Sequence, residues 1–272
     1  MVLTRAVPAL RGALGFLSRV PVGRADGDWE AFRRTPAAMP VVAYALGGLI
    51  ALPLAAATLG PVRVPSPTFA AAFPAWLYLV TGITHLDGVA DLGDAAVVHG
   101  DADRRREVMK DSALGVGGAL ALALTVFGVA AAGTVTVDLA RLSLVDAVAL
   151  VVAAEVGAKA ATATLVCVGE APHEGLGSAL TGESGPRALG GVALATAPVA
   201  LLGWPALRPG VGSFGAAFYP AATVAAALAV AGIVYAWARS RLGGVSGDVL
   251  GATNELARVV GLHVGVIAWT LS

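Results

Sequence analysis

Long apolar stretches alternate with short polar segments along almost the whole chain. A helix that crosses a bilayer needs about 20 mostly apolar residues, and several stretches approach this length. The second and the last are short enough to be re-entrant or to lie at the membrane surface. The stretches are residues 40–59, 69–83, 114–135, 142–168, 189–207, 216–238 and 259–271. The pattern therefore predicts an all-α, polytopic transmembrane helical bundle of about six to seven spans.

The composition agrees with this class. Of the 272 residues, 57% are hydrophobic and only 13% are charged, whereas a typical soluble domain is about 25% charged. The formal net charge is zero, so no overall basic field would attract nucleic acid, and we expect none as a partner. No soluble segment interrupts the apolar pattern. We therefore expect one integral-membrane domain over residues 1–272, in which residues 1–39 form a basic arm.

The basic residues predict the orientation of the bundle. Lys and Arg concentrate in cytoplasmic loops of membrane proteins, and here they occur in the arm and in every second connection after it. The intervening connections hold only Arg63, Arg141 and Arg208. We therefore expect a multi-pass protein of the cell membrane, embedded in the lipid bilayer, whose polar and potentially catalytic loops face the cytoplasm.

Three acidic residues share one face of a predicted helix after the second apolar stretch. Asp87, Asp91 and Asp94 stand at i, i+4 and i+7, within a sector of roughly 60° on a helix. Like charges at this spacing repel one another, and a divalent cation such as Mg²⁺ would relieve the repulsion because it prefers hard oxygen ligands. The alternative is a solvated acidic turn. Nearby, His85 could orient a metal-bound carboxylate, act as a general base, or be an ordinary histidine at the membrane boundary.

A second polar segment precedes the third apolar stretch. Lys110 and Asp111 stand directly at the membrane boundary. Opposite the first carboxylates, Asp111 could complete a metal site and Lys110 could meet a phosphate. The three arginines from Arg104 to Arg106 could contribute to the same phosphate site or could simply anchor the cytoplasmic face.

A third polar segment is rich in glycine. Gly244 and Gly247 would allow backbone amides to turn toward an anion. Asp248 and Glu255 are seven residues apart, which is one face of a helix. Such a glycine-rich turn with two acids at a membrane boundary is compatible with a phosphate or metal site.

These segments resemble the signatures of the cobalamin synthase family. The central signature is His85-Leu-Asp-Gly-Val-Ala-Asp-Leu-Gly-Asp94, followed by Arg104–Arg106 and Val108-Met-Lys-Asp-Ser112. The stretch from Gly244 to Ala252 with Glu255 resembles a second signature, and residues 16–22 and 174–178 resemble two looser ones. The sequence departs from the family at residues 171–173, where a more polar segment containing Arg and Tyr is usual.

The resemblance implies the last assembly step of the cobalamin nucleotide loop, in a membrane enzyme that uses Mg²⁺. α-Ribazole, or its 5′-phosphate, would attack the phosphorus on the cobinamide side of adenosylcobinamide-GDP, and GMP would leave. Whether the chain forms a homo-oligomer is left open. By this resemblance and the spacing above, the expected site residues are, for catalysis, Asp87, Asp91, Asp94 and His85; for metal binding, Asp87, Asp91, Asp94, Asp111, Asp248 and Glu255; and for substrate or phosphate binding, Arg19, Arg104, Arg105, Lys110, Ser112, Gly244, Gly247 and Asn254.

Two other functions are compatible with parts of the sequence. The acidic segment loosely resembles that of the CDP-alcohol phosphotransferases, but Asp91 stands where that motif has Arg. A transporter could use Glu155 and Lys159, which lie at i, i+4 inside the fourth apolar stretch. An isolated charge at the centre of a span costs roughly 2.5–3.5 kcal/mol, so we expect these two to pair and face the bundle interior. Most acids lie in the polar loops, which favours the enzyme.

Overall fold

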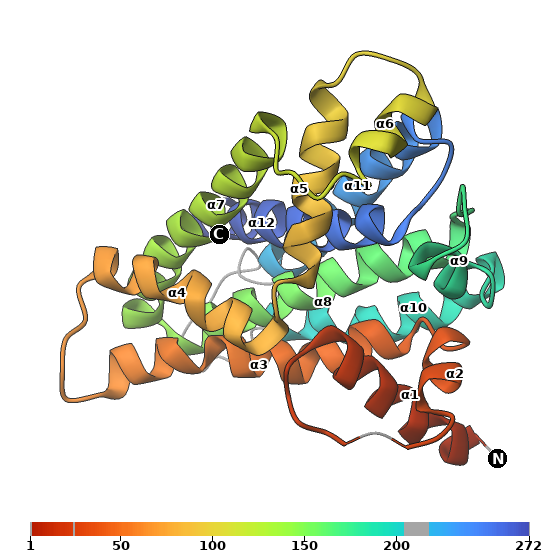
Figure 1. The fold of residues 1–272 in the computed structure, drawn as a ribbon. Helices are drawn as coiled ribbons and strands as arrows, with labels where there is room; N and C mark the ends of the chain where they lie inside the picture. The colour runs from red at the N-terminus through yellow and green to blue at the C-terminus, as the bar shows by residue number, and fades with distance from the viewer. Residues whose placement is uncertain (1, 24, 204–217, 272) are drawn as a thin grey trace.

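The computed structural model describes residues 2–23, 25–203 and 218–271, and every regular element in these ranges is helical (Figure 1). The predicted all-α class is therefore confirmed. In chain order the α-helices are α1 (Val2–Leu17), α2 (Asp28–Arg33), α3 (Ala38–Leu59), α4 (Ser66–Thr81), α5 (Thr84–Val97), α6 (Ala102–Val108), α7 (Val116–Leu142), α8 (Leu144–Val168), α9 (Leu176–Thr181), α10 (Leu189–Thr196), α11 (Phe218–Arg241) and α12 (Gly247–Thr270), with 3-10 turns at Pro186–Ala188 (η1) and Ala197–Gly203 (η2).

Helix α8 forms the centre of the bundle. It packs against α3, α11 and α12 (Figure 1), and every residue from 149 to 163 is buried. Glycines allow this close packing: a Cβ at Gly47 of α3 would lie 2.7 Å from the Cα of Val152, and one at Gly157 would lie 3.0 Å from Ala227 of α11. A helix enclosed on all sides in this way keeps its charged residues away from lipid.

The number of membrane spans differs from the sequence expectation. Among the described residues, four helical segments are long and apolar enough to cross a membrane by length and composition, namely Ala38–Leu59, Val116–Leu142, Pro186–Gly203 and Phe218–Arg241. A fifth is obtained only if α4 and α5 are counted as one broken span. A multi-pass membrane bundle is thus consistent with the structure, whereas a count of six to seven spans is not confirmed.

Three of the expected spans differ from the helices that the fold contains. The stretch 69–83 corresponds to α4, which has only 16 residues. The stretch 142–168 corresponds to α8, which is enclosed by other helices and is not among the four apolar segments. The stretch 259–271 is the second half of α12, because this helix already begins at Gly247. Residues 204–207 and 216–217, at the ends of two further expected spans, lie outside the described residues.

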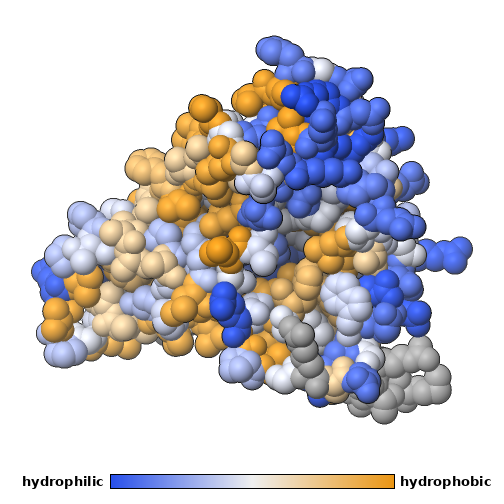
Figure 2. Space-filling view, in the orientation of Figure 1, coloured by the Kyte–Doolittle hydropathy of each residue, from blue (hydrophilic) through white to orange (hydrophobic). Residues whose placement is uncertain are grey.

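Polar and apolar surfaces lie at opposite parts of the molecule. Figure 2 shows hydrophilic side chains gathered around α6 and α9 and hydrophobic side chains over α4 and α7. Outward-facing Leu124 and Phe127 of α7 are 60% and 72% exposed, as expected of side chains that face lipid. The second and third polar segments, through α6 and the start of α12, lie toward the hydrophilic end.

Candidate active site

Helix α5, which carries the acidic signature, begins at a sharp elbow. Gly82 ends α4 with φ of +79°, a conformation that glycine adopts without strain, and α5 then leaves at 109° to α4. The backbone N–H of Arg19 donates to the carbonyl of Val80 over 2.8 Å, so the N-terminal arm holds the end of α4. Helix α5 has 14 residues, about 21 Å at 1.5 Å per residue, and it lies outside the four apolar segments.

Two glycines of the signature bring α5 against its neighbours. A Cβ at Gly88 would collide with the carbonyl of Asp248 and would lie 2.9 Å from its Cα. A Cβ at Gly93 would lie 2.7 Å from the carbonyl oxygen of Gly117 in α7. The missing side chains therefore admit the backbones of α12 and α7. The two glycines therefore leave no open space beside the acids. Instead, the close packing at Gly88 places Asp248 against α5.

Three carboxylates then lie together without a cationic partner. We call Asp87, Asp91 and Asp248 the acidic face. Asp87 is exposed, and Asp91 and Asp248 are half-buried. Burial, followed by the negative charges of Asp248, Asp87 and Asp94, raises the pKa of Asp91 to about 7. Among the described residues, no Lys or Arg forms an ion pair with any member of the acidic face. A bound cation would remove this unfavourable charge concentration.

Asp94, the third acid of the signature, has a different role. Its two oxygens accept hydrogen bonds from the backbone N–H groups of Gly115 and Gly118, each over 2.8 Å. It therefore caps the N-terminus of α7, where a negative charge is stabilised by the unpaired amides and the helix dipole. Both oxygens thus serve the cap, and the expected metal-binding and catalytic roles of Asp94 stay predictions.

The arginines of α6 also divide into different roles. Arg105 is buried, with 8% of its surface exposed, and donates to the carbonyls of Ala95 and Ala96 at the end of α5. Arg104 is exposed and pairs with Glu107 over 2.6 Å. Neither side chain points to the acidic face, so the expected phosphate-binding role of both is not supported.

Arg106, which was considered with its two neighbours but left out of the final set of expected binding residues, lies beside the acidic face instead. It donates to the carbonyl of Leu242 over 2.6 Å. With Lys110, His173, Ser246 and Asp248, it lines a cavity of about 30 Å³. Arg106 and Lys110 stand four residues apart, and this helical spacing was the sequence signal that would have identified Arg106. Lys110 lines the same cavity, and its expected phosphate-binding role stays a prediction.

Two other expected residues of this loop do not reach the acidic face. Asp111 is exposed, and its Oδ1 accepts from the backbone N–H of Ala113 over 3.0 Å. Ser112 is exposed, and no contact of its side chain with the site is present among the described residues. The expected metal-binding role of Asp111 is therefore not supported by this arrangement.

The glycine-rich turn before α12 is used for packing. The N–H of Gly244 lies 3.3 Å from the carbonyl of Ala238, and a Cβ there would lie 3.1 Å from the nitrogen of Pro172. A Cβ at Gly247 would lie 3.1 Å from the side chain of Leu176. The amide of Gly244 thus closes the end of α11, where an anion was expected. Arg19 is exposed, and its side chain lies against Gly82 at the elbow.

A second polar cluster lies deep between α8 and α12. We call Glu155, Lys159, Asn254, Glu255 and Arg258 the buried network, since each is at most 1% exposed. Lys159 Nζ lies 2.9 Å from Glu155 Oε1 and 2.7 Å from Asn254 Oδ1. Arg258 Nε lies 2.7 Å from Glu155 Oε2, and Arg258 also pairs with Glu255. The expected pairing of Glu155 with Lys159 is confirmed.

This network also accounts for two residues that were expected to bind metal or substrate. Glu255 Oε1 accepts from Asn254 Nδ2 over 2.9 Å, and its Oε2 faces Arg258 and the hydroxyl of Tyr78. Asn254 Nδ2 also lies 3.0 Å from His85 Nδ1. Glu255 and Asn254 are thus enclosed by protein partners, which removes them from the metal and phosphate sets and connects them to His85.

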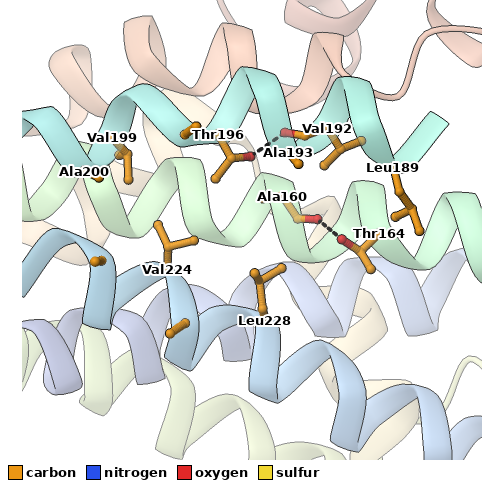
Figure 3. A pocket seen from close by; sticks show the side chains of 13 residues that line it. Ala160, Thr164, Leu189, Val192, Ala193, Thr196, Val199, Ala200, Val224 and Leu228 are labelled. Carbon is orange, nitrogen blue, oxygen red and sulfur yellow. Dashed lines mark hydrogen bonds between the residues drawn. The ribbon is translucent and has the colours of Figure 1, made fainter. Parts of the chain in front are cut away.

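A sizeable apolar cavity lies away from these groups among the described residues. It has about 440 Å³ between α8, α10, η2 and α11 (Figure 3). Its two threonine hydroxyls donate within their own helices, Thr164 to Ala160 and Thr196 to Val192, each over 2.8 Å. The remaining lining is apolar and contains no titratable residue. Its size alone therefore does not make it a site for phosphate chemistry.

The carboxylates of the acidic face could hold Mg²⁺ only together with a bound ligand that supplies further oxygen atoms. Among the described residues, no group of three or more His, Cys, Asp or Glu side chains is placed to hold a metal ion alone. Mg²⁺ is usually bound by one or two carboxylates, waters and substrate phosphates. Asp91 and Asp248, with Asp87 beside them, supply such carboxylates, and Arg106 and Lys110 line the cavity that Asp248 borders.

Comparisons with known proteins identify the family of this chain. A family model described as cobalamin-5-phosphate synthase matches residues 9–266. A relative from Halorubrum lacusprofundi named adenosylcobinamide-GDP ribazoletransferase is 58% identical, over 99% of both chains. Relatives of the same name from Haloquadratum walsbyi and Methanocella arvoryzae are 46% and 33% identical, over 97% and 96% of this chain and 99% and 96% of theirs. No solved structure matches. The chain belongs to the cobalamin-5-phosphate synthase family.

Proposed function

We propose that this chain joins α-ribazole, or its 5′-phosphate, to adenosylcobinamide-GDP, and so forms adenosylcobalamin or its 5′-phosphate with release of GMP. The observation that carries the proposal is the juxtaposition, at the hydrophilic end, of uncompensated carboxylates on α5 and α12 with two cations from α6 and its following loop. The names of the full-length relatives supply the substrates.

In the proposed reaction the attacking hydroxyl oxygen forms a bond to the phosphorus on the cobinamide side. The bond from that phosphorus to the bridging oxygen breaks, the electron pair leaves with GMP, and the proton of the hydroxyl group is released to the solution. Displacement of this kind gains mostly from positioning and from stabilisation of charge on the phosphate oxygens. The protein must therefore hold the diphosphate firmly and place positive charge around it.

In this proposal, carboxylates hold a metal ion on one side of the diphosphate, and two cationic side chains contact its other side. Asp91 and Asp248, with Asp87 beside them, would hold Mg²⁺, which when bound neutralises charge on the diphosphate oxygens. Arg106 and Lys110 contact phosphate oxygens from α6 and the loop that follows it. Because the carbonyl of Leu242 and the carboxylate of Asp103 already fix the guanidinium of Arg106, that group is placed before the substrate arrives, and such preorganisation favours a transition state.

The direct test is an assay of purified protein in lipid vesicles with adenosylcobinamide-GDP and α-ribazole. GMP release should require both substrates and Mg²⁺, and a chelator should stop it. An equal rate of GMP release without α-ribazole would indicate hydrolysis, and no release under any metal condition would reject the proposed reaction.

We propose further that the acidic face opens to the cytoplasm, because basic residues dominate the segments at that end of the molecule. Cysteines are best placed at Arg104 and Arg241, which are exposed, and at Arg63 for the opposite side. In a Cys167→Ala background, impermeant reagents should label the first two only from the cytoplasmic side and Arg63→Cys only from outside. Labelling of Arg104→Cys from outside would reject this orientation.

A further inference from the structure

His85 is held at the junction between the buried network and the surface. It lies in the first turn of α5, and its backbone packs against α12, where a Cβ at Gly251 would lie 3.2 Å from the His85 Cα. Its Nδ1 lies 3.0 Å from Asn254 Nδ2. Which of the two imidazole nitrogens carries the proton depends on whether Asn254 presents its nitrogen or its oxygen to the ring.

Two charged neighbours fix the orientation of the Asn254 amide. Asn254 Oδ1 lies 2.7 Å from Lys159 Nζ, and an ammonium group can only donate. Asn254 Nδ2 lies 2.9 Å from Glu255 Oε1, and an ionised carboxylate can only accept. A flipped amide would set NH₂ against the ammonium and an oxygen against the carboxylate, with both charges buried. The nitrogen of Asn254 therefore faces His85.

This orientation decides the tautomer of His85. A carboxamide nitrogen has two hydrogens and no acceptor, and here one hydrogen points to Glu255 and the other to His85 Nδ1. In a neutral imidazole the nitrogen that accepts carries no proton, so the proton lies on Nε2. Glu255 Oε1 is the competing partner for a proton on Nδ1, but at 3.5 Å it is farther from Nδ1 than the amide nitrogen is.

The other ring nitrogen is turned outward. The His85 side chain is 14% exposed, and no described residue forms a hydrogen bond with Nε2. Among the described residues, Arg33 Nε is the buried side-chain nitrogen or oxygen without a partner, so Nε2 is not sealed in the interior. Arg19, an exposed cation, lies against Gly82 at the same elbow. An N–H donor and a guanidinium thus share this part of the surface.

We propose that Lys159, Asn254 and Glu255 hold His85 as a neutral hydrogen-bond donor through Nε2, aimed at an anionic oxygen of the substrate, and that His85 is not the general base. The nitrogen that could take up a proton is Nδ1, which is occupied by Asn254. His85 is the residue that touches substrate, and Lys159 and Asn254 are positioning residues. The choice of a phosphate oxygen as the acceptor rests on the proposed function, whereas the tautomer does not.

Nitrogen NMR of the reconstituted protein tests the tautomer without any turnover. The chain has four histidines, so ¹⁵N-histidine labelling and a His85→Gln reference identify the His85 signals. The proposal expects an unprotonated Nδ1 and a protonated Nε2 at neutral pH. In Asn254→Asp, which offers only acceptor oxygens, the proton should move to Nδ1. A protonated Nδ1 in the wild-type protein would overturn the proposal, even if the enzyme proved to be a transferase.

A pair of substitutions tests the donor role, and it does not depend on folding of Asn254→Asp. The amide nitrogen of glutamine can occupy the position of Nε2, whereas the shorter asparagine reaches only the position of Nδ1. His85→Gln should keep GMP release within about tenfold of wild type, and His85→Asn should lose on the order of a hundredfold, as for loss of one charge-stabilising donor. Equal loss in both variants would point to proton abstraction, which neither amide can perform, and would overturn the proposal.

Discussion

The acidic face and the buried network both bring carboxylates to α12 from a neighbouring helix, yet their charges are balanced differently. The network holds Glu155 and Glu255 against Lys159 and Arg258, so its formal charges cancel. The acidic face holds Asp87, Asp91 and Asp248 with no cation paired to them among the described residues. The two regions also differ in burial. The residues of the network are at most 1% exposed, whereas Asp87 of the acidic face is exposed.

The difference shows how to distinguish structural from functional charge in a membrane bundle. Buried charges persist only when partners satisfy them, and Glu155 and Arg258 meet that condition through two hydrogen bonds. Charges that the protein leaves uncompensated are costly to the fold, and such clusters are typical of sites that bind an ion or substrate. The comparison therefore predicts different effects for substitutions in the two regions.

The largest effect should follow from removing Arg258. In Arg258→Met the two buried glutamates share only Lys159, which leaves one uncompensated negative charge in the interior. Breaking a buried pair in this way typically costs about 3–5 kcal/mol. Unfolding of the purified protein in mild detergent should show this loss. The matched control is Arg104→Met, which breaks an exposed pair and should change stability little; similar losses in both would contradict the assigned difference.

The next largest effect is on catalysis. Asp91→Asn keeps the size of the side chain but loses its charge, and it should lower GMP release by a hundredfold or more, about 3 kcal/mol in barrier height. Stability should be preserved, because one charge leaves a repelling cluster. Asp87→Asn should act in the same direction. Asp101, which caps α6 through the N–H of Arg104, provides the control, since Asn caps a helix about as well as Asp.

A near-normal rate for Asp91→Asn at saturating Mg²⁺ would indicate that the acidic face is a solvated turn without a catalytic role. An Asp101→Asn variant as damaged as Asp91→Asn would show that any acid near this end of the protein matters, and the special status of the acidic face would be lost.

A substitution at Gly88 should disturb the close contact between α5 and α12 that brings Asp248 to the acidic face. In Gly88→Ala the added Cβ meets the backbone of Asp248, so α5 and α12 must move apart at a cost of typically about 1–3 kcal/mol. GMP release should fall while helical content is retained, as measured by circular dichroism. At Gly232 of α11 no atom lies within 4 Å of the position that a Cβ would occupy, and Gly232→Ala should be neutral or slightly stabilising. Equal activity of the two variants would argue against a shared site of α5 and α12.

The smallest effect concerns coupling inside the buried network. Lys159→Met alone leaves Glu155 paired only with Arg258, and the added Glu155→Gln should recover part of the lost stability. Contacting charged residues usually show coupling of about 0.5–3 kcal/mol. A double-mutant cycle by detergent unfolding measures it. A double variant no more stable than the worse single variant would argue that the two residues act independently.

The residue types of the site are predictable from the sequence, whereas their individual roles are less so. The i, i+4, i+7 spacing identified the carboxylates of α5, but only the fold shows that Asp94 caps α7, since its partners lie more than 20 positions further along the chain. Arg105 and Arg106 are adjacent in sequence and carry the same charge, but their hydrogen-bond partners differ. Arg105 donates to a carbonyl at the end of α5, whereas Arg106 donates to the carbonyl of Leu242. The role of each residue is determined by tertiary packing, which the spacing of residues along the chain does not reveal.

The same limit explains the spans. Apolar length located α3, α7 and α11 well. It did not distinguish a lipid-facing helix from α8, because small apolar residues serve both helix packing and contact with lipid. It also missed that α12 begins at Gly247, since the polar residues in the first half of this helix resemble those of a loop. These residues instead meet buried partners on α8 and α5.

Metal binding tests the contrast between the two regions most directly. Mn²⁺ prefers the same oxygen ligands as Mg²⁺, and its binding to the reconstituted protein with GDP present can be followed by electron paramagnetic resonance. Asp91→Asn should weaken Mn²⁺ binding at least about tenfold, whereas Glu255→Gln, an equally conservative change in the buried network, should leave it unchanged. Unaltered affinity in Asp91→Asn, or a loss confined to Glu255→Gln, would contradict the assignment of the acidic face as the cation site.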